Sequence, residues 1–198
     1  MVGLRAPISA VLCSQNPHKL EELRLILPHW SLDLLRAADY PPEDGASYEE
    51  NARGKARFGR ATAAGEALAI GEDSGIEVAA LDGAPGIESA SWAGDGVERL
   101  LAELEGASDR RARYVCTMVG IAPDGTERVA HGVLEGRIAM ARSGSEGFGY
   151  DPVFVPEDEG RTVAELGDAW KAEHSHRALA AMALLAQSSS WRKRGRAR

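Results

Sequence analysis

The feature that most constrains this chain lies near its start, where an apolar run, a polar turn and an amphipathic segment follow one another. The run Ala10-Val11-Leu12-Cys13-Ser14 predicts a short buried strand. Pro17 then suits the first turn of a helix over about residues 17–27, whose leucines recur on one face. A strand, a turn and a helix in this order are typical of an α/β fold.

The rest of the chain continues this alternation. Ser47-Tyr48-Glu49-Glu50 has the pattern of a capping box, and Pro123-Asp124-Gly125-Thr126 that of a hairpin turn. The expected strands cover residues 31–35, 67–71, 76–81, 114–122, 127–139 and 153–155, and the expected helices residues 47–64, 97–104 and 175–187. Neither a repeat nor a linker divides the chain, so we expect one domain over residues 1–198, with a twisted mixed sheet flanked by helices.

Composition narrows the class of protein. A hydrophobic content of 44% is enough for a core, yet no apolar run reaches the ~18 residues of a membrane span. The first five residues lack the parts of a signal peptide. Cys13 and Cys116 lie in separate apolar contexts and are expected to be buried free thiols. We therefore expect a cytoplasmic protein without membrane contact.

The charge distribution argues against nucleic acid as a partner. The formal net charge is −7, and nucleic-acid binding needs basic surface. The exception is a basic tail at the C-terminus, which contains Arg192, Lys193, Arg194, Arg196 and Arg198. We expect residues 188–198 to be a disordered, solvated terminus.

Two polar motifs have residues suited to phosphate and metal chemistry. Ser14 to Lys19 form a strand-to-helix turn, where backbone N–H groups and a lysine can bind an anion. Glu72 and Asp73 are expected at the end of an apolar strand, where carboxylates suit Mg²⁺, and Glu43 in an earlier loop can join them. The alternatives are a capped helix and a polar turn between strands.

Two further motifs suit a nucleobase. In Gly147-Phe148-Gly149-Tyr150-Asp151, two glycines let the backbone approach a ligand closely while the aromatic ring offers a stacking surface. Lys171 and the segment His174-Ser175-His176-Arg177 are expected to open the last helix, where cations indicate an anionic or keto-rich ligand. A tight turn and a surface charge cluster are the alternatives.

The combination is more specific than any of its parts. In chain order the sequence contains Ser-Gln-Asn-Pro-His-Lys, Glu-Glu-Asn-Ala with Lys55, Glu-Asp-Ser-Gly, Gly-Ala-Pro-Gly-Ile, Gly-Phe-Gly-Tyr-Asp-Pro and Ser-His-Arg. This spaced set, over about residues 8 to 187, resembles the inosine triphosphate pyrophosphatase family, also described as dITP/XTP pyrophosphatases.

The resemblance implies a fold, an activity and a set of site residues. It implies two lobes around an active-site cleft, and a Mg²⁺-dependent homodimer that hydrolyses the α–β phosphate bond of ITP, dITP and XTP. Asp73 becomes the catalytic carboxylate, and Asp73, Glu43 and Glu72 the metal ligands. The implied substrate-binding residues are Ser14, Gln15, Asn16, Pro17, His18, Lys19, Lys55, Ser74, Phe148, Gly149, Tyr150, Asp151, Lys171, His176 and Arg177.

The sequence leaves some alternatives open. Asp73 can either hold the metal or accept the proton of the attacking water. A related Maf-like pyrophosphatase, a nucleotide sensor without catalysis and a nucleic-acid module working through the tail are the competing functions. Ser91 stands where the family usually has a basic residue, for which Arg53 or Arg57 can substitute, and the segment 95–101 departs from the family pattern.

Overall fold

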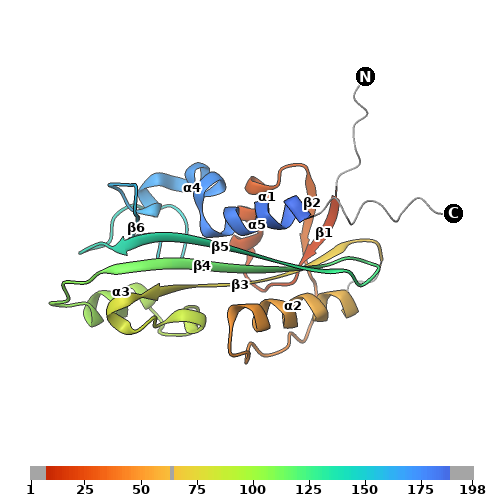
Figure 1. The fold of residues 1–198 in the computed structure, drawn as a ribbon, viewed down its shortest axis with the longest axis horizontal. Helices are drawn as coiled ribbons and strands as arrows, with labels where there is room; N and C mark the ends of the chain where they lie inside the picture. Colours follow the sequence, from red (N-terminus) through yellow and green to blue (C-terminus); the bar gives the residue numbers. More distant parts are fainter. Residues whose placement is uncertain (1–7, 63–64, 188–198) are drawn as a thin grey trace, which may run out of the picture.

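The architecture is an open α/β sheet of six strands, as expected from the sequence (Figure 1). The computed structural model describes residues 8–62 and 65–187. The strands are β1 Ile8–Leu12, β2 Trp30–Leu34, β3 Leu68–Val78, β4 Arg111–Ile121, β5 Glu127–Ile138 and β6 Phe154–Pro156. The helices are α1 Pro17–Ile26, α2 Tyr48–Thr62, α3 Gly96–Glu103, α4 Val163–His174 and α5 His176–Ala186.

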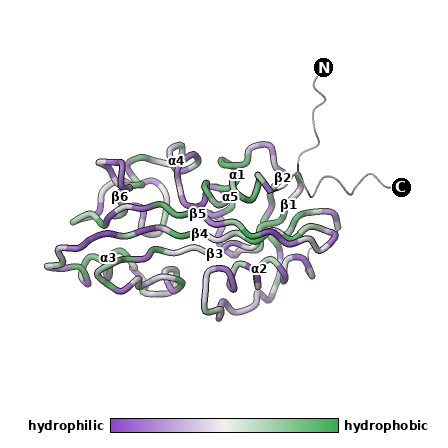
Figure 2. The backbone as a smooth tube through the Cα atoms, viewed as in Figure 1, coloured by the Kyte–Doolittle hydropathy of each residue, from purple (hydrophilic) through white to green (hydrophobic). Residues whose placement is uncertain are grey.

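The sheet is mixed, with the order β2-β1-β3-β4-β5-β6. The pairs β1–β2 and β1–β3 are parallel, and the later pairs are antiparallel. Figure 1 shows α1, α4 and α5 above the strands and α2 below them, while α3 packs against the same face of β3 as α1 and α5. In Figure 2, β1 and most of α5 are coloured as hydrophobic, in agreement with their place in the core.

Two apolar clusters form along one face of β3 and β4. The first cluster contains Leu68 and Ile70 of β3 and packs against α1 and α5. The second contains Ile76 and Val78 and packs against α3 and β6. Because side chains alternate along a strand, residues 68, 70, 72, 74, 76 and 78 share this face. Glu72 and Ser74 therefore lie between the two clusters.

The structure corrects the expected strand boundaries in the middle of the chain. The sequence predicted strands at 67–71 and 76–81, with Glu72 and Asp73 at the end of the first, but β3 runs without a break through both regions. Its pairing with β4 continues across the polar residues, where Asp73 is opposite Thr117. Backbone pairing is thus compatible with buried carboxylates here, because other side chains neutralise them.

A helix was also missed before the last one. Thr162 caps α4 in a capping box with Glu165, and this pattern is a local sequence signal for the start of a helix. Lys171 consequently lies in the last turn of α4, where the helix dipole favours a cation, and it does not open the final helix as expected. The expected box at α2 is half confirmed, because Ser47 accepts from the Glu50 N–H but the Glu50 carboxylate accepts from Ala46.

Other expectations about the chain are confirmed. The turn between β4 and β5 joins them as a hairpin, and α5 covers the range expected for the final helix. Cys13 and Cys116 are buried free thiols. In the described part of the chain, none of the helices is long and apolar enough to cross a membrane. The basic tail at residues 192–198 lies outside the described residues.

Candidate active site

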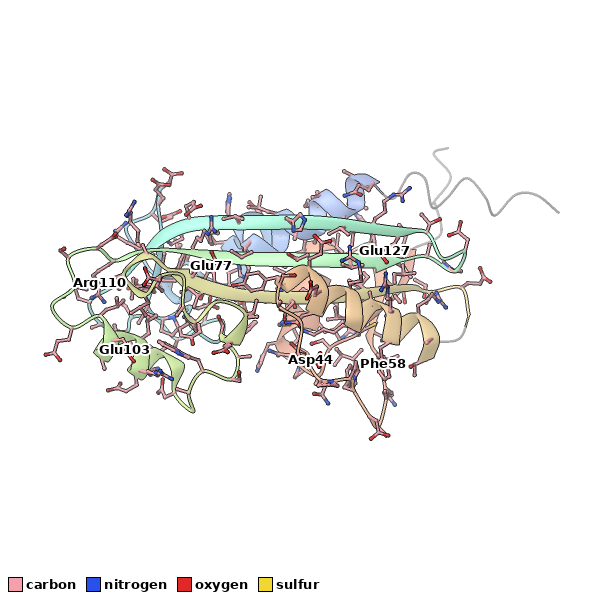
Figure 3. All side chains as sticks on the ribbon, turned by 60° about the horizontal axis from the view of Figure 1, so that its bottom comes forward. Asp44, Phe58, Glu77, Glu103, Arg110 and Glu127 are labelled. Carbon is pink, nitrogen blue, oxygen red and sulfur yellow. The ribbon has the colours of Figure 1, made fainter. Side chains whose placement is uncertain are left out.

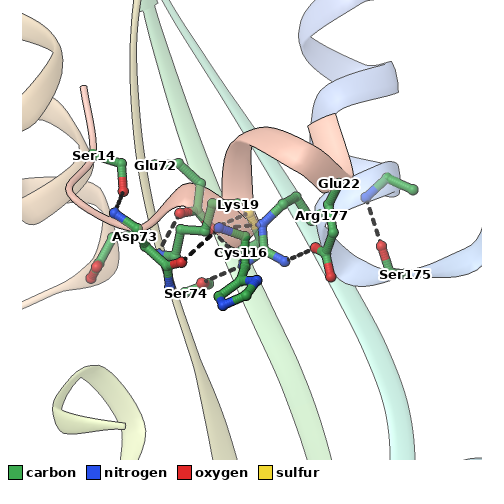
Figure 4. Close-up of polar contacts among 12 residues, drawn as sticks. Ser14, Lys19, Glu22, Glu72, Asp73, Ser74, Cys116, Ser175 and Arg177 are labelled. Carbon is green, nitrogen blue, oxygen red and sulfur yellow. Dashed lines mark hydrogen bonds and ion pairs between the residues drawn. The ribbon is translucent and has the colours of Figure 1, made fainter. Parts of the chain in front are cut away.

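The centre of the candidate site is a carboxylate buried inside the sheet. The Glu72 side chain is fully buried, and its Oε2 lies 2.6 Å from the Lys19 ammonium. The Arg177 guanidinium donates to the other oxygen from Nε at 3.3 Å and Nη2 at 3.1 Å (Figure 4). Burial alone would raise the pKa of Glu72, but Lys19 and Arg177 hold it well below its ordinary value. Glu72 is therefore ionised and saturated by protein partners.

The buried charges continue beyond Arg177 as a series of alternating sign. Glu22 of α1 accepts from both Arg177 and Lys171, and Lys171 also donates to Asp151 at 2.7 Å. Asp151 in turn accepts from the Tyr114 hydroxyl at 3.1 Å. We call Lys19, Glu72, Arg177, Glu22, Lys171 and Asp151 the buried charge series. Its three cations and three anions balance, which is a condition for burying charge at tolerable cost.

Glu22 is a site residue that sequence reasoning missed. It follows Lys19 by three residues on α1, so the two side chains lie on one helix face. A carboxylate three residues after a candidate anion-binding lysine is a local sequence signal that the two side chains belong to one site. Its partners Lys171 and Arg177 are more than 140 residues away in the sequence, and that pairing is not readable from local pattern.

His176 is buried beside this series and stays neutral. Burial and the Arg177 charge lower its pKa well below its ordinary value. The imidazole stacks on Tyr114 with ring centroids 4.6 Å apart, and its Nδ1 has no hydrogen-bond partner among the described residues. A buried ring nitrogen without a partner is costly unless a ligand completes it, so His176 is ready to bind a polar group.

Phe148 offers a ring between the first turn of α1 and the buried cations. Its ring stacks on His18 at 5.4 Å, and the Lys171 ammonium lies 4.8 Å from its centroid. Gly147 precedes it with a positive φ of 76°, and a Cβ there would lie 2.1 Å from an Asp151 oxygen. Only glycine therefore fits at Gly147, and the turn that presents Phe148 depends on it.

A cavity of about 400 Å³ opens over these residues, a volume in the range of small-molecule sites. Ten of the expected substrate-binding residues line it: Asn16, Lys19, Ser74, Phe148, Gly149, Tyr150, Asp151, Lys171, His176 and Arg177. Ser14 and Gln15 instead line a second, separate hollow beside Tyr40. Pro17 and His18 form the first turn of α1.

Asp73 lies on the opposite face of β3 from Glu72, because neighbouring residues of a strand alternate. Lys55 of α2 places its ammonium 3.0 Å from Asp73 and 2.7 Å from the exposed Glu43, and Asn51 donates to Asp73 at 3.2 Å. Burial raises the pKa of Asp73 above its ordinary value despite the Lys55 charge. Figure 4 shows Ser14 on the side of Asp73, and Arg177 and Glu22 on the other side.

These carboxylates differ in how well they suit a metal ion. The carboxylates of Glu43 and Asp73 both contact the Lys55 ammonium group. Their oxygens at that point therefore already accommodate a cation. Glu72 has no oxygen left for a metal, because Lys19 and Arg177 occupy both. Among the described residues, no group of three or more acidic, His or Cys side chains could hold a metal ion. Mg²⁺ typically uses one or two carboxylates with substrate phosphates, and Glu43 with Asp73 fit that pattern.

The arginines considered as substitutes for a basic residue at Ser91 are engaged elsewhere. Arg53 donates to Glu127 at 2.7 Å and to Glu49 at 2.6 Å, and Arg57 lies 3.6 Å from Glu127. Figure 3 shows Glu127 on the sheet beside α2. In this conformation both arginines serve the contact between α2 and the sheet.

The open α/β sheet carries a cavity lined by an aromatic ring, fixed cations and a neutral imidazole, a set of groups that suits a nucleotide. The chain belongs to the Ham1 family, whose model matches residues 10–187. A dITP/XTP pyrophosphatase of Bdellovibrio bacteriovorus is 44% identical over 152 residues, which cover 73% of this chain and 76% of that protein. One from Streptomyces coelicolor is 42% identical over 191 residues, with coverages of 88% and 94%. The structure of the Staphylococcus aureus Ham1 protein matches with a TM-score of 0.79 and 35% identity, over 92% of this chain and 98% of that one.

The charge balance of the series predicts the effect of Glu22→Gln on stability. The amide leaves the three cations of the series with two anions, so the free energy of unfolding should fall by about 3 kcal/mol or more. The matched control is Glu21→Gln on the same helix, whose side chain is 70% exposed and should change stability by less than ~0.5 kcal/mol. Urea unfolding of both variants measures the difference. Equal stability of the two would show that Glu22 does not neutralise Lys171 and Arg177.

Proposed function

We propose that this protein hydrolyses the α–β phosphate bond of the non-standard purine nucleotides ITP, dITP and XTP, releasing the monophosphate and pyrophosphate. Membership of the Ham1 family and the printed activity of its curated relatives support this function. The observation that carries it is the position of the cavity. The cavity is lined by a fixed set of hydrogen-bond donors and by Ser74, the residue that follows Asp73 in β3.

The donors account for the choice of base. Asp151 and Glu22 take two of the three N–H groups of Lys171, and the third remains for a ligand. Arg177 donates to Glu72, Glu22 and Ser74 and so has little free capacity. Hypoxanthine and xanthine present an acceptor oxygen at position six, whereas adenine presents an amino donor. Adenine would set donor against donor in a buried site.

The triphosphate extends, in this proposal, past the turn at Ser14 to Lys19 toward Lys55. Ser14 accepts from the Asn16 N–H, and Asn16 accepts from the His18 N–H, which fixes the turn ahead of α1. The N-terminus of α1 favours negative charge there, and the Lys19 ammonium keeps N–H groups beyond its pair with Glu72 that can donate to a phosphate. Because Lys55 already contacts Asp73, this position brings the α-phosphate close to that carboxylate.

The reaction needs a water molecule, a base and charge neutralisation. The water oxygen attacks the α-phosphorus, the bond from that phosphorus to the bridging oxygen breaks, and pyrophosphate leaves. Lys55 and Asn51 hold the Asp73 carboxylate where it can either accept the proton of the attacking water or hold a metal ion. When bound by Glu43 and Asp73, Mg²⁺ would neutralise charge on the phosphates. Lys55 orients Asp73 and balances its charge.

The proposal extends to the assembly and the location of the protein. The resemblance to the family implies a homodimer, and the composition implies the cytoplasm. We propose that the described residues form one domain and that the tail at 188–198 takes no part in the chemistry. A Maf-like preference for pyrimidines, or a sensor without turnover, are the competing functions that the assays below separate.

The first test is a panel of ITP, XTP, ATP and dTTP with purified protein and Mg²⁺. We expect kcat/KM for ITP and XTP to exceed that for ATP by ~10⁴ or more, because a site built around a hydrogen bond rejects the analogue that lacks it. A preference for dTTP would support the Maf-like alternative. Tight binding of ITP without turnover would support a sensor.

Asp73→Asn tests the assignment of the catalytic carboxylate. The amide is nearly isosteric but is no base and a poorer metal ligand, so kcat for ITP should fall at least ~10²-fold while the fold is kept. Asp33→Asn, at an exposed carboxylate of β2, is the control and should retain full activity. If Asp73→Asn keeps more than a third of the wild-type rate, Asp73 takes no part in the mechanism.

A further inference from the structure

One ion pair at the cavity differs from all the others there. Four cations line the cavity, and three of them, Lys19, Lys171 and Arg177, pair with buried carboxylates. The fourth, Arg142, pairs with Asp95, and these two side chains are 42% and 56% exposed. Arg142 Nη2 lies 2.5 Å from each Asp95 oxygen, and both residues line the cavity.

The pair joins two walls of the cavity. Asp95 is the N-cap of α3 and accepts from the Glu98 N–H at 2.9 Å, so its position is fixed by the helix. Arg142 begins the segment that leads to Phe148. The same two walls meet again where the Tyr150 hydroxyl donates to the Ser89 carbonyl at 3.1 Å. Arg142 is thus a half-exposed cation facing a wall that is held independently of it.

The Arg142–Asp95 pair is the one that a ligand can separate most easily. A half-exposed ion pair contributes little free energy to stability, whereas separating a buried pair of the charge series would leave an unpaired buried charge. An anionic or acceptor group that enters the cavity can therefore take over the Arg142 guanidinium at small cost. Asp95 keeps its hydrogen bond to Glu98 and stays solvated.

The chemistry of the bases indicates which group this is. Hypoxanthine has only hydrogen at position two, and xanthine has a carbonyl oxygen there. Xanthine is also much more acidic than hypoxanthine, because its anion spreads charge over the ring and both carbonyl oxygens. The proposed function assigns the free N–H of Lys171 to the position-six oxygen, so the extra oxygen of xanthine requires another donor in the same cavity.

We propose that Arg142 is a specificity-determining residue that leaves Asp95 to bind the position-two oxygen of xanthine and its negative charge. The inference rests on the proposed function and deepens it by separating xanthine nucleotides from inosine nucleotides. Arg142 favours the xanthine base, and Asp95 opposes it by competing for the guanidinium and by repelling the anion.

The test is calorimetric binding of the monophosphates XMP and IMP, which requires no turnover. Arg142→Gln should weaken XMP binding roughly tenfold or more relative to IMP, the scale of a lost hydrogen bond to a charged group. Asp95→Asn should change the ratio in the opposite direction and favour XMP, because asparagine still caps α3 while Arg142 is released. Arg111→Gln is the control, since Arg111 forms an exposed pair with Asp109 outside the cavity.

The outcomes separate this inference from the proposed function. An unchanged XMP-to-IMP ratio in Arg142→Gln, or a ratio that moves in the same direction in both variants, would overturn the role of Arg142. Hydrolysis of ITP by the wild type is measured separately and tests the proposed function alone. Binding that follows the prediction without any hydrolysis would support the inference and refute the hydrolase.

Discussion

The structure depends on the neutralisation of a carboxylate buried in the middle of its sheet. Glu72 is fully buried between two apolar clusters, and an unpaired charge there would cost several kcal/mol. Lys19 and Arg177 neutralise it, and each comes from a helix that packs on the same face of the sheet. The ion pairs therefore fix the N-terminal turns of α1 and α5 against β3.

The alternation of side chains along β3 explains how one strand serves two parts of the site. Glu72 and Ser74 face the cavity side and hold Arg177, while Asp73 faces α2 and Lys55. A base held by the charge series and a phosphate held near Lys55 would then lie on the two sides of a single strand. The continuous pairing of β3 with β4 keeps the separation between them constant.

The sequence predicted the fold better than it predicted the contacts. Apolar periodicity and turn residues located most strands and helices, because these signals are local. The interruption expected at Glu72 was wrong, since the cost of burying this carboxylate is offset by Lys19 and Arg177, which are distant in sequence. Ten of the residues that local motifs indicated for substrate binding line one cavity. Glu22 and the Arg142–Asp95 pair were missed for the same reason, because their partners are set by tertiary packing.

The most direct test of the account is the fate of the oxygen during hydrolysis of ITP in ¹⁸O-labelled water. The protein, Mg²⁺ and ITP are incubated in the labelled water, and ³¹P NMR identifies the products and the phosphorus that carries the label. Attack on the α-phosphorus predicts labelled IMP and unlabelled pyrophosphate. Label in pyrophosphate, or orthophosphate as the product, would place the reaction at another bond and contradict the position assigned to Asp73.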